Sequence, residues 1–185
     1  MSKMNTTAYY EQGSENNVTC VFSCPGRLEE KNNRPVSGVT GSNLNKLFLI
    51  LNDKLKVNIF ERGKVTITNA TCKIEYKSKT GKSEGTKKEV LEDSNLERLF
   101  NDLCNTEKYI LVFGENAKLA LKEIEKRYKF LYNPKIIYVR HLGLQSLNQI
   151  KNDINHKPLQ RGESNNTIKR LEVVVEDMLK QMKNQ

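Results

Sequence analysis

Three predicted strands end in residues that can do chemistry. The strand from Val21 runs into Ser23-Cys24-Pro25-Gly26, Asn69 closes an alternating run, and His141 follows an apolar run by two residues. After Pro25-Gly26 the chain passes through a polar loop and a second turn, R-P-V-S-G-V-T-G, into an apolar helix pattern. In α/β proteins such a break builds a pocket at the carboxyl end of a strand. The pattern therefore predicts a pocket with a hydroxyl, a thiol, an amide and an imidazole at its edge.

Strands and helices that could position these residues alternate along the chain. Apolar or β-branched runs predict four strands, at Asn17–Cys24, Lys64–Ala70, Tyr109–Gly114 and Ile136–Val139. Apolar residues at helical spacing predict four helices, at Asn43–Leu55, Asp93–Cys104, Asn116–Leu131 and Thr167–Met182. We therefore expect residues 1–185 to form one α/β domain, a three-layer α/β/α sandwich with a mostly parallel four-stranded central sheet. Residues 1–17 are polar, and we expect them to be loosely ordered.

The Ser23–Leu44 stretch resembles the first motif of the uracil-DNA glycosylase superfamily, closest to its thermostable family 4 branch. That branch has roughly G-E-A-P-G, followed by G-R-P-F-x-G-x-A-G-x-x-L. The residues on matching positions are Pro25, Gly26, Arg34, Pro35, Gly38, Gly41 and Leu44. Three more segments align in order, namely V-T-I-T-N-A-T-C (65–72), I-L-V-F-G-E-N-A-K-L-A-L (110–121) and I-I-Y-V-R-H-L-G-L-Q-S-L (136–147). The resemblance thus spans about residues 18–150.

The resemblance implies a DNA glycosylase, which extrudes a nucleotide and hydrolyses its N-glycosidic bond. That reaction builds positive charge on the sugar and negative charge on the departing base. By analogy, His141 stabilises the leaving base, Asn69 reads the base edge, and the turn at Pro25 and Gly26 lines the base pocket. No lysine occupies a motif position for Schiff-base chemistry. We therefore expect a monofunctional enzyme that leaves an abasic site.

The first motif differs from the superfamily pattern at the positions of the catalytic residues. Ser23 and Cys24 stand where members carry a catalytic Glu, Asp or Asn. The acid could have moved to Glu29 or Glu30 in the loop over the same pocket, the enzyme could act on an unusual base that leaves more easily, or catalysis could be lost. The H-P-S motif also reads H-L-G from His141 onward. The candidate catalytic residues are His141, Ser23, Cys24 and Glu29.

Basic and loop residues predict contacts with DNA. Residues 73–88 hold six lysines in sixteen positions and predict a basic loop or hairpin on the DNA backbone, or a solvated loop with no partner. The T-G-K-S within it lacks the earlier glycine and the following helix of a phosphate loop. Leu144 follows His141 on a loop that could wedge into the base stack. The candidate DNA-binding residues are Arg34, Ser42, Lys77, Lys79, Lys82, Arg140 and Leu144.

The amino-acid composition favours a polyanionic partner. The 185 residues carry 31 Lys+Arg against 22 Asp+Glu, a formal charge of +9, which favours a polyanion. A lysine-rich proteome from an AT-rich genome would give the same excess. No apolar run approaches the roughly 20 residues of a membrane span, and residues 1–10 lack the apolar core of a secretory signal. We expect a cytoplasmic monomer that binds DNA and no membrane.

The cysteines do not predict a metal or a cofactor. Cys20, Cys24, Cys72 and Cys104 are scattered, and C-x-x-x-C is not the usual zinc spacing. Family 4 glycosylases hold an iron–sulfur cluster with four cysteines, two of them in an N-terminal C-x-x-C, which this chain lacks. We expect reduced thiols.

Three hypotheses follow. The first is a DNA glycosylase for a modified or non-standard base, in repair or in defence against phage DNA. The second is a catalytically inactive, glycosylase-like DNA-binding protein, motivated by Ser23 and Cys24. The third is an α/β enzyme acting on small nucleosides, which the lysines of segment 73–88 disfavour.

Overall fold

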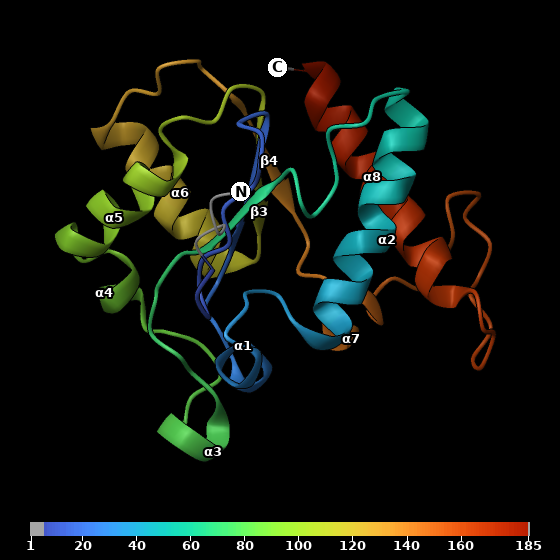
Figure 1. Cartoon of the computed structure of the whole chain (residues 1–185). Helices are drawn as coiled ribbons and strands as arrows, with labels where there is room; N and C mark the ends of the chain where they lie inside the picture. Colours follow the sequence, from blue (N-terminus) through green and yellow to red (C-terminus); the bar gives the residue numbers. More distant parts are fainter. Residues whose placement is uncertain (1–5, 185) are drawn as a thin grey trace.

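Four parallel strands form one central sheet in the order β2-β1-β3-β4 (Figure 1). The computed structural model describes residues 6–184 of the chain. The strands are β1 (Val18–Phe22), β2 (Thr66–Asn69), β3 (Tyr109–Phe113) and β4 (Lys135–Val139). Every pairing is parallel, so all four carboxyl ends lie at one edge of the sheet. The predicted α/β sandwich around a four-stranded sheet is confirmed.

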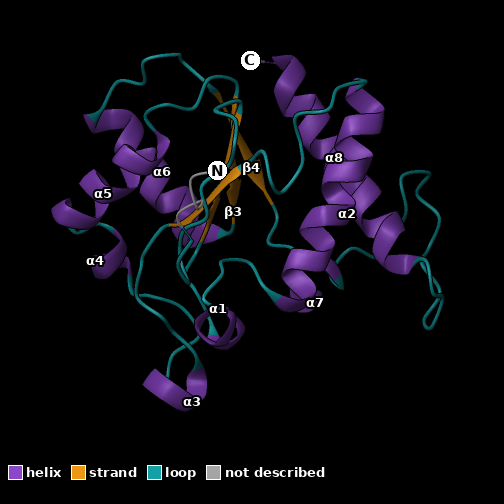
Figure 2. Cartoon of the chain, viewed as in Figure 1, coloured by secondary structure: helices purple, strands orange, loops and turns teal. Residues whose placement is uncertain are grey.

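Helices cover both faces of the sheet (Figure 2). On one face lie α2 (Gly38–Leu55) and α8 (Asn166–Asn184), and on the other lie α4 (Lys87–Val90), α5 (Asp93–Leu103) and α6 (Glu115–Arg127). Strand residues alternate between these two layers, as the pleat requires. Cys20 and Phe22 of β1 pack with α2 and α8, whereas Val21 packs with α5 and α6. Each face of the sheet thus has its own buried cluster.

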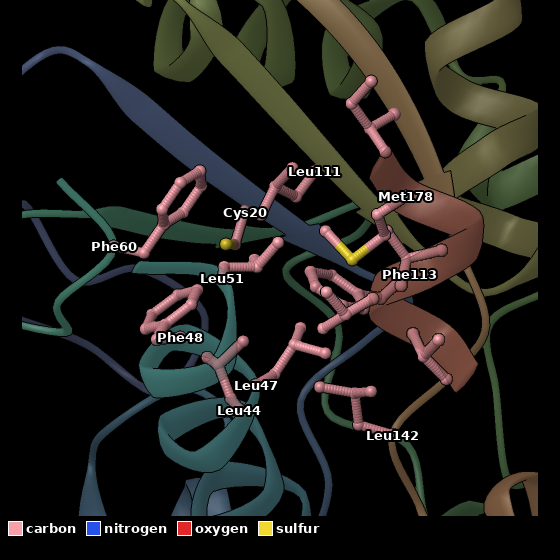
Figure 3. Packing of buried hydrophobic residues seen from close by; sticks show 14 of the residues in the cluster. Cys20, Leu44, Leu47, Phe48, Leu51, Phe60, Leu111, Phe113, Leu142 and Met178 are labelled. Carbon is pink, nitrogen blue, oxygen red and sulfur yellow. The ribbon is translucent and has the colours of Figure 1, made fainter. Parts of the chain in front are cut away.

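Helical spacing on α2 accounts for the first cluster (Figure 3). The fully buried side chains Leu44, Leu47 and Leu51 recur every three or four residues, and Phe48 is 2% exposed. They pack with Leu111 and Phe113 of β3 and with Met178 of α8. The helix begins five residues earlier than its apolar pattern predicts, because its first turn from Gly38 carries no apolar stripe.

Three short helices lie at the carboxyl edge of the sheet, the lower end in Figure 1. They are α1 (Arg27–Asn32), α3 (Lys77–Thr80) and α7 (Leu144–Leu147). None is long enough to show a helical period in the sequence. The prediction of a hairpin at residues 73–88 is therefore wrong. The segment contains α3 and the first residues of α4.

The N-terminal segment is bound to the outer edge of β2. The backbone N–H of Glu11 donates to the carbonyl of Ile67 at 2.8 Å, and the N–H of Ile67 donates back at 2.9 Å. Gly13 donates to the Thr66 hydroxyl at 3.1 Å. An edge strand has unpaired backbone groups that such a segment satisfies. Residues 6–17 are therefore tied to the sheet by hydrogen bonds, and the loose order expected at the start of the chain concerns residues 1–5, which lie outside the described residues.

Candidate functional site

Ser23, Gly114 and His141 meet at the carboxyl edge of the sheet. They follow β1, β3 and β4 in turn. Gly114 has φ +93°, and a Cβ there would lie 3.0 Å from Ser23 Oγ and 3.7 Å from His141 Cδ2. Glycine is required at this position because its backbone is left-handed and because the other two side chains pack against it.

The Ser23 hydroxyl is buried and unpaired. The residue is 4% exposed, and Oγ has no hydrogen-bond partner within residues 6–184. A buried hydroxyl without a partner costs free energy, and a bound polar group or water would offset that cost. Ser23 can therefore offer a hydrogen bond to a group that enters the site beside His141.

His141 is held in one orientation by its own loop. Its Nδ1 accepts a hydrogen bond from the backbone N–H of Gly143 at 3.0 Å. The neutral ring must then carry its proton on Nε2, which has no protein partner within residues 6–184. The ring also meets Phe22 edge-on, with centroids 6.3 Å apart. His141 thus presents an unused N–H donor.

Burial keeps His141 neutral. It lowers the pKa of the imidazole below its ordinary 6.5, although the charges of Glu84 and Glu29 act in the opposite direction. A neutral imidazole is the form that the Gly143 hydrogen bond requires. The site therefore holds an uncharged donor at neutral pH.

Cys24 is a poor nucleophile. Burial raises the pKa of its thiol to about 11, helped by the charges of Glu84, Glu75 and Glu29. The sulfur lies 3.9 Å from the carbonyl oxygen of Ser83. A protonated thiol of this kind neither attacks nor orients water readily.

Glu29 and Glu30 support the loop structure. Glu29 Oε2 accepts from the N–H of Gly26 at 3.0 Å, and its Oε1 accepts from the N–H of Ser37 at 2.7 Å. Glu30 accepts from the Tyr76 hydroxyl at 2.8 Å and pairs with Lys79. Both carboxylates that could have taken over the catalytic role are thus bound to α1, α3 and the turn before α2.

Asn69 and the Pro25-Gly26 turn are also tied into the fold. Asn69 is 1% exposed, and its Nδ2 donates to the carbonyl of Tyr9 at 3.1 Å. The Pro25 carbonyl accepts from the N–H of Glu75 at 3.0 Å. The N-terminal segment therefore uses the amide donor that base reading would need.

The predicted DNA-binding residues fall into paired and unpaired groups. Arg34 forms hydrogen bonds with Glu11, and Arg140 donates to Ser146 and Gln149 at 3.0 Å each. Lys79 pairs with Glu30. Ser42, Lys77 and Lys82 are exposed, and Leu144 is 52% exposed. These exposed residues lie on α2, α3 and α7 and in the loop after α3.

Two asparagines and one glutamate of the site escaped prediction. Asn43 donates to the Leu142 carbonyl at 2.8 Å and so anchors the His141 loop. Asn116 donates to the Gly85 carbonyl at 2.9 Å and to Glu84 Oε2 at 3.4 Å. No local pattern marks them, since each acts on a distant segment. Glu84 was not predicted because it lies in segment 73–88, whose six lysines mark it as basic.

Residues 6–184 contain no group of three or more His, Cys, Asp or Glu side chains able to hold a metal ion. No helix in the same range is long and apolar enough to cross a membrane. No model of a known protein family matches the chain, and no curated protein matches it.

Proposed function

We propose that the protein is a monofunctional DNA glycosylase that flips a modified or non-standard base and hydrolyses its N-glycosidic bond. The single observation that carries this proposal is the neutral His141 ring, whose Nδ1 accepts from Gly143 and whose Nε2–H is unused. The buried, unpaired Ser23 hydroxyl beside it supports a bound polar group at the same place. The resemblance to the uracil-DNA glycosylase superfamily supports the choice of reaction.

In this mechanism His141 acts on the departing base. Its Nε2–H donates to a carbonyl oxygen of the flipped base and stabilises the negative charge that develops as the glycosidic bond breaks. Water adds to the sugar carbon as the carbon–nitrogen bond breaks, one water proton is lost to solvent, and the departing base takes up a proton. The products are the free base and an abasic site.

Charge and surface favour DNA as the partner. The chain carries a formal charge of +9, and Lys77 and Lys82 are exposed near the carboxyl edge of the sheet. A cationic surface gains affinity by releasing counterions from phosphates. We propose a cytoplasmic monomer that acts in repair or in defence against phage DNA.

A second function is a catalytically inactive DNA-binding protein on the same fold. The observation that favours it is that Glu29 and Asn69 are both engaged in structural hydrogen bonds. The site then lacks the amide that the resemblance assigns to base reading and the carboxylate that could have replaced the missing acid.

A base-release assay separates the two. DNAs carrying uracil, hypoxanthine, xanthine, methylated, hydroxymethylated or glucosylated bases are incubated with the protein, and freed base is detected by mass spectrometry. Release that is lost in His141→Ala and kept in His156→Ala would support the glycosylase. His156 is the matched control because it is the other of the two histidines and is exposed. No release from any DNA, with binding that weakens steeply in salt, would favour the binding protein.

A further inference from the structure

The charges of two carboxylates, Glu84 and Glu29, oppose the burial that lowers the pKa of His141. Both oxygens of Glu29 accept hydrogen bonds from backbone N–H groups, so Glu29 caps α1 and the turn before α2. Glu84 is exposed, and its one contact to Asn116 is long, at 3.4 Å. Its Oε1 has no partner within residues 6–184. Of the two carboxylates, Glu84 retains the capacity to accept a proton or to bind water.

Segment 83–85 contacts the residues around the site at two points. The Ser83 carbonyl lies 3.9 Å from Cys24 Sγ, and the Gly85 carbonyl accepts from Asn116 at 2.9 Å. Gly85 is buried, and a Cβ there would lie 3.1 Å from a methyl carbon of Thr71. The two contacts come from the residue that follows the end of β1 by two positions and from the first turn of α6, so Glu84 lies near the carboxyl edge of the sheet.

We propose that Glu84 is the carboxylate that orients the hydrolytic water and accepts its proton, in place of the acidic residue absent from Ser23 and Cys24. This inference rests on the proposed glycosylase function. The water oxygen bonds to the sugar carbon as the carbon–nitrogen bond breaks, and the bond's electron pair leaves with the base, which His141 stabilises. The water proton passes to Glu84 and is later lost to solvent, and the base gains a proton from solvent. Ser23 donates a hydrogen bond from its buried hydroxyl to the group that enters the site beside His141.

The role fits the chemistry of the chain around Glu84. The flanking Lys82 and nearby Lys77 would hold phosphates on either side of a flipped nucleotide, while Glu84 remains the acidic group among them. Because Glu84 lies in the same segment as these lysines, DNA bound by the lysines would have its backbone beside the carboxylate.

The test uses single-turnover base release with the full chain in excess over a DNA substrate identified in the base-release assay. Glu84→Gln should lower the rate by about 100-fold or more with DNA affinity unchanged. Glu92→Gln removes an exposed glutamate eight residues further along the chain and should leave the rate unchanged. Thermal melting shows whether each variant is folded. A Glu84→Gln variant that is folded and as active as the unmodified protein would overturn the proposal.

Rescue by a small carboxylate gives a second measurement. Glu84→Ala should regain base release as formate is added, because formate can occupy the space of the lost carboxylate, whereas His141→Ala should not respond. A folded, inactive Glu84→Ala variant that formate does not restore would contradict a direct role on water. If the unmodified protein releases no base from any DNA, the proposed function itself fails, and the role of Glu84 fails with it.

Discussion

Asn43 holds Leu142 by a hydrogen bond from its side-chain amide to the Leu142 carbonyl at 2.8 Å, across 99 residues of sequence. Both residues are buried, and Leu142 belongs to the cluster between the sheet and α2. The loop that carries His141 is thus fixed to the first turns of α2. Orientation of the imidazole depends on this contact as well as on Gly143.

Asn43→Ala should therefore harm stability and base release together. The substitution leaves a buried carbonyl unpaired, which costs about 1–3 kcal/mol of unfolding free energy. Urea unfolding measures this loss, and single-turnover base release should fall because His141 loses its fixed position. Asn45→Ala, an exposed change on the same helix, should alter neither. Equal stability of the two variants would contradict the anchoring role.

Glu11 joins the N-terminal segment to the turn before α2. Its carboxylate accepts hydrogen bonds from Arg34 at 3.1 Å and from Arg62 Nη2 at 2.9 Å. Arg62 also donates to the Val36 carbonyl at 2.9 Å. Burial alone would raise the pKa of Glu11, but the two guanidinium groups outweigh burial and lower it.

Glu11→Gln should lower the unfolding free energy by about 3 kcal/mol at neutral pH, because Arg62, whose side chain is only 15% exposed, is left without its anion. Since the folded pKa of Glu11 is lowered, its stabilisation is present above the unfolded pKa of about 4.3 and is lost as pH falls through the folded pKa. The difference between the variant and the unmodified protein should therefore shrink in acid. Urea unfolding across this pH range measures it.

Glu61→Gln is the control for Glu11, because its side chain is 60% exposed and pairs with Lys64 at 3.5 Å. It should change the unfolding free energy by less than about 1 kcal/mol. A Glu11→Gln variant as stable as Glu61→Gln at neutral pH would show that the N-terminal segment is not held by this cluster.

The sequence predicts the helices, the strands and their sheet far better than it predicts the polar contacts between them. Strand runs such as Tyr109–Phe113 and the helical stripe on α2 are local patterns, so their elements and the sheet edge follow from them. The Asn69 contact with Tyr9 joins residues 60 apart, which no local pattern reveals. Glu29 caps α1, a helix too short to show a period. Tertiary packing decides which of the residues at the strand ends keep a hydrogen-bonding group free for a ligand.

Ser23→Ala should leave stability unchanged or slightly raised. The hydroxyl is buried and unpaired within residues 6–184, so its removal relieves a desolvation cost. Base release should nevertheless fall, by about fivefold for a lost neutral hydrogen bond of roughly 1 kcal/mol. Chemical unfolding and single-turnover release on the same preparation test both statements.

Thr19→Val is the matched control for Ser23→Ala. Thr19 also has a buried hydroxyl, but it shares a hydrogen bond of 2.7 Å with Thr106. The substitution leaves the Thr106 hydroxyl unpaired and should cost about 1–2 kcal/mol without changing base release. If Ser23→Ala destabilises the protein as much as Thr19→Val does, then Ser23 serves the fold and not a ligand.

His141 should give base release an acid limb below neutral pH. Burial lowers the pKa of its imidazole below 6.5, so the ring is neutral at pH 7 and Nδ1 can accept from Gly143. Protonation places a proton on Nδ1 and breaks that hydrogen bond, so the ring loses the contact that fixes its orientation. Release should therefore be constant near pH 7 and fall as pH drops through the folded pKa.

The lowered pKa of His141 also predicts that the folded protein loses stability in acid. Because the unfolded chain binds the His141 proton more readily than the folded chain does, acid below about pH 6.5 favours unfolding. His141→Asn should remove this part of the acid sensitivity, and His156→Ala should keep it. Titration of the imidazole Hε1 resonance by NMR measures the pKa directly. A His141 midpoint above 6.5 would contradict the neutral donor on which the proposed mechanism depends.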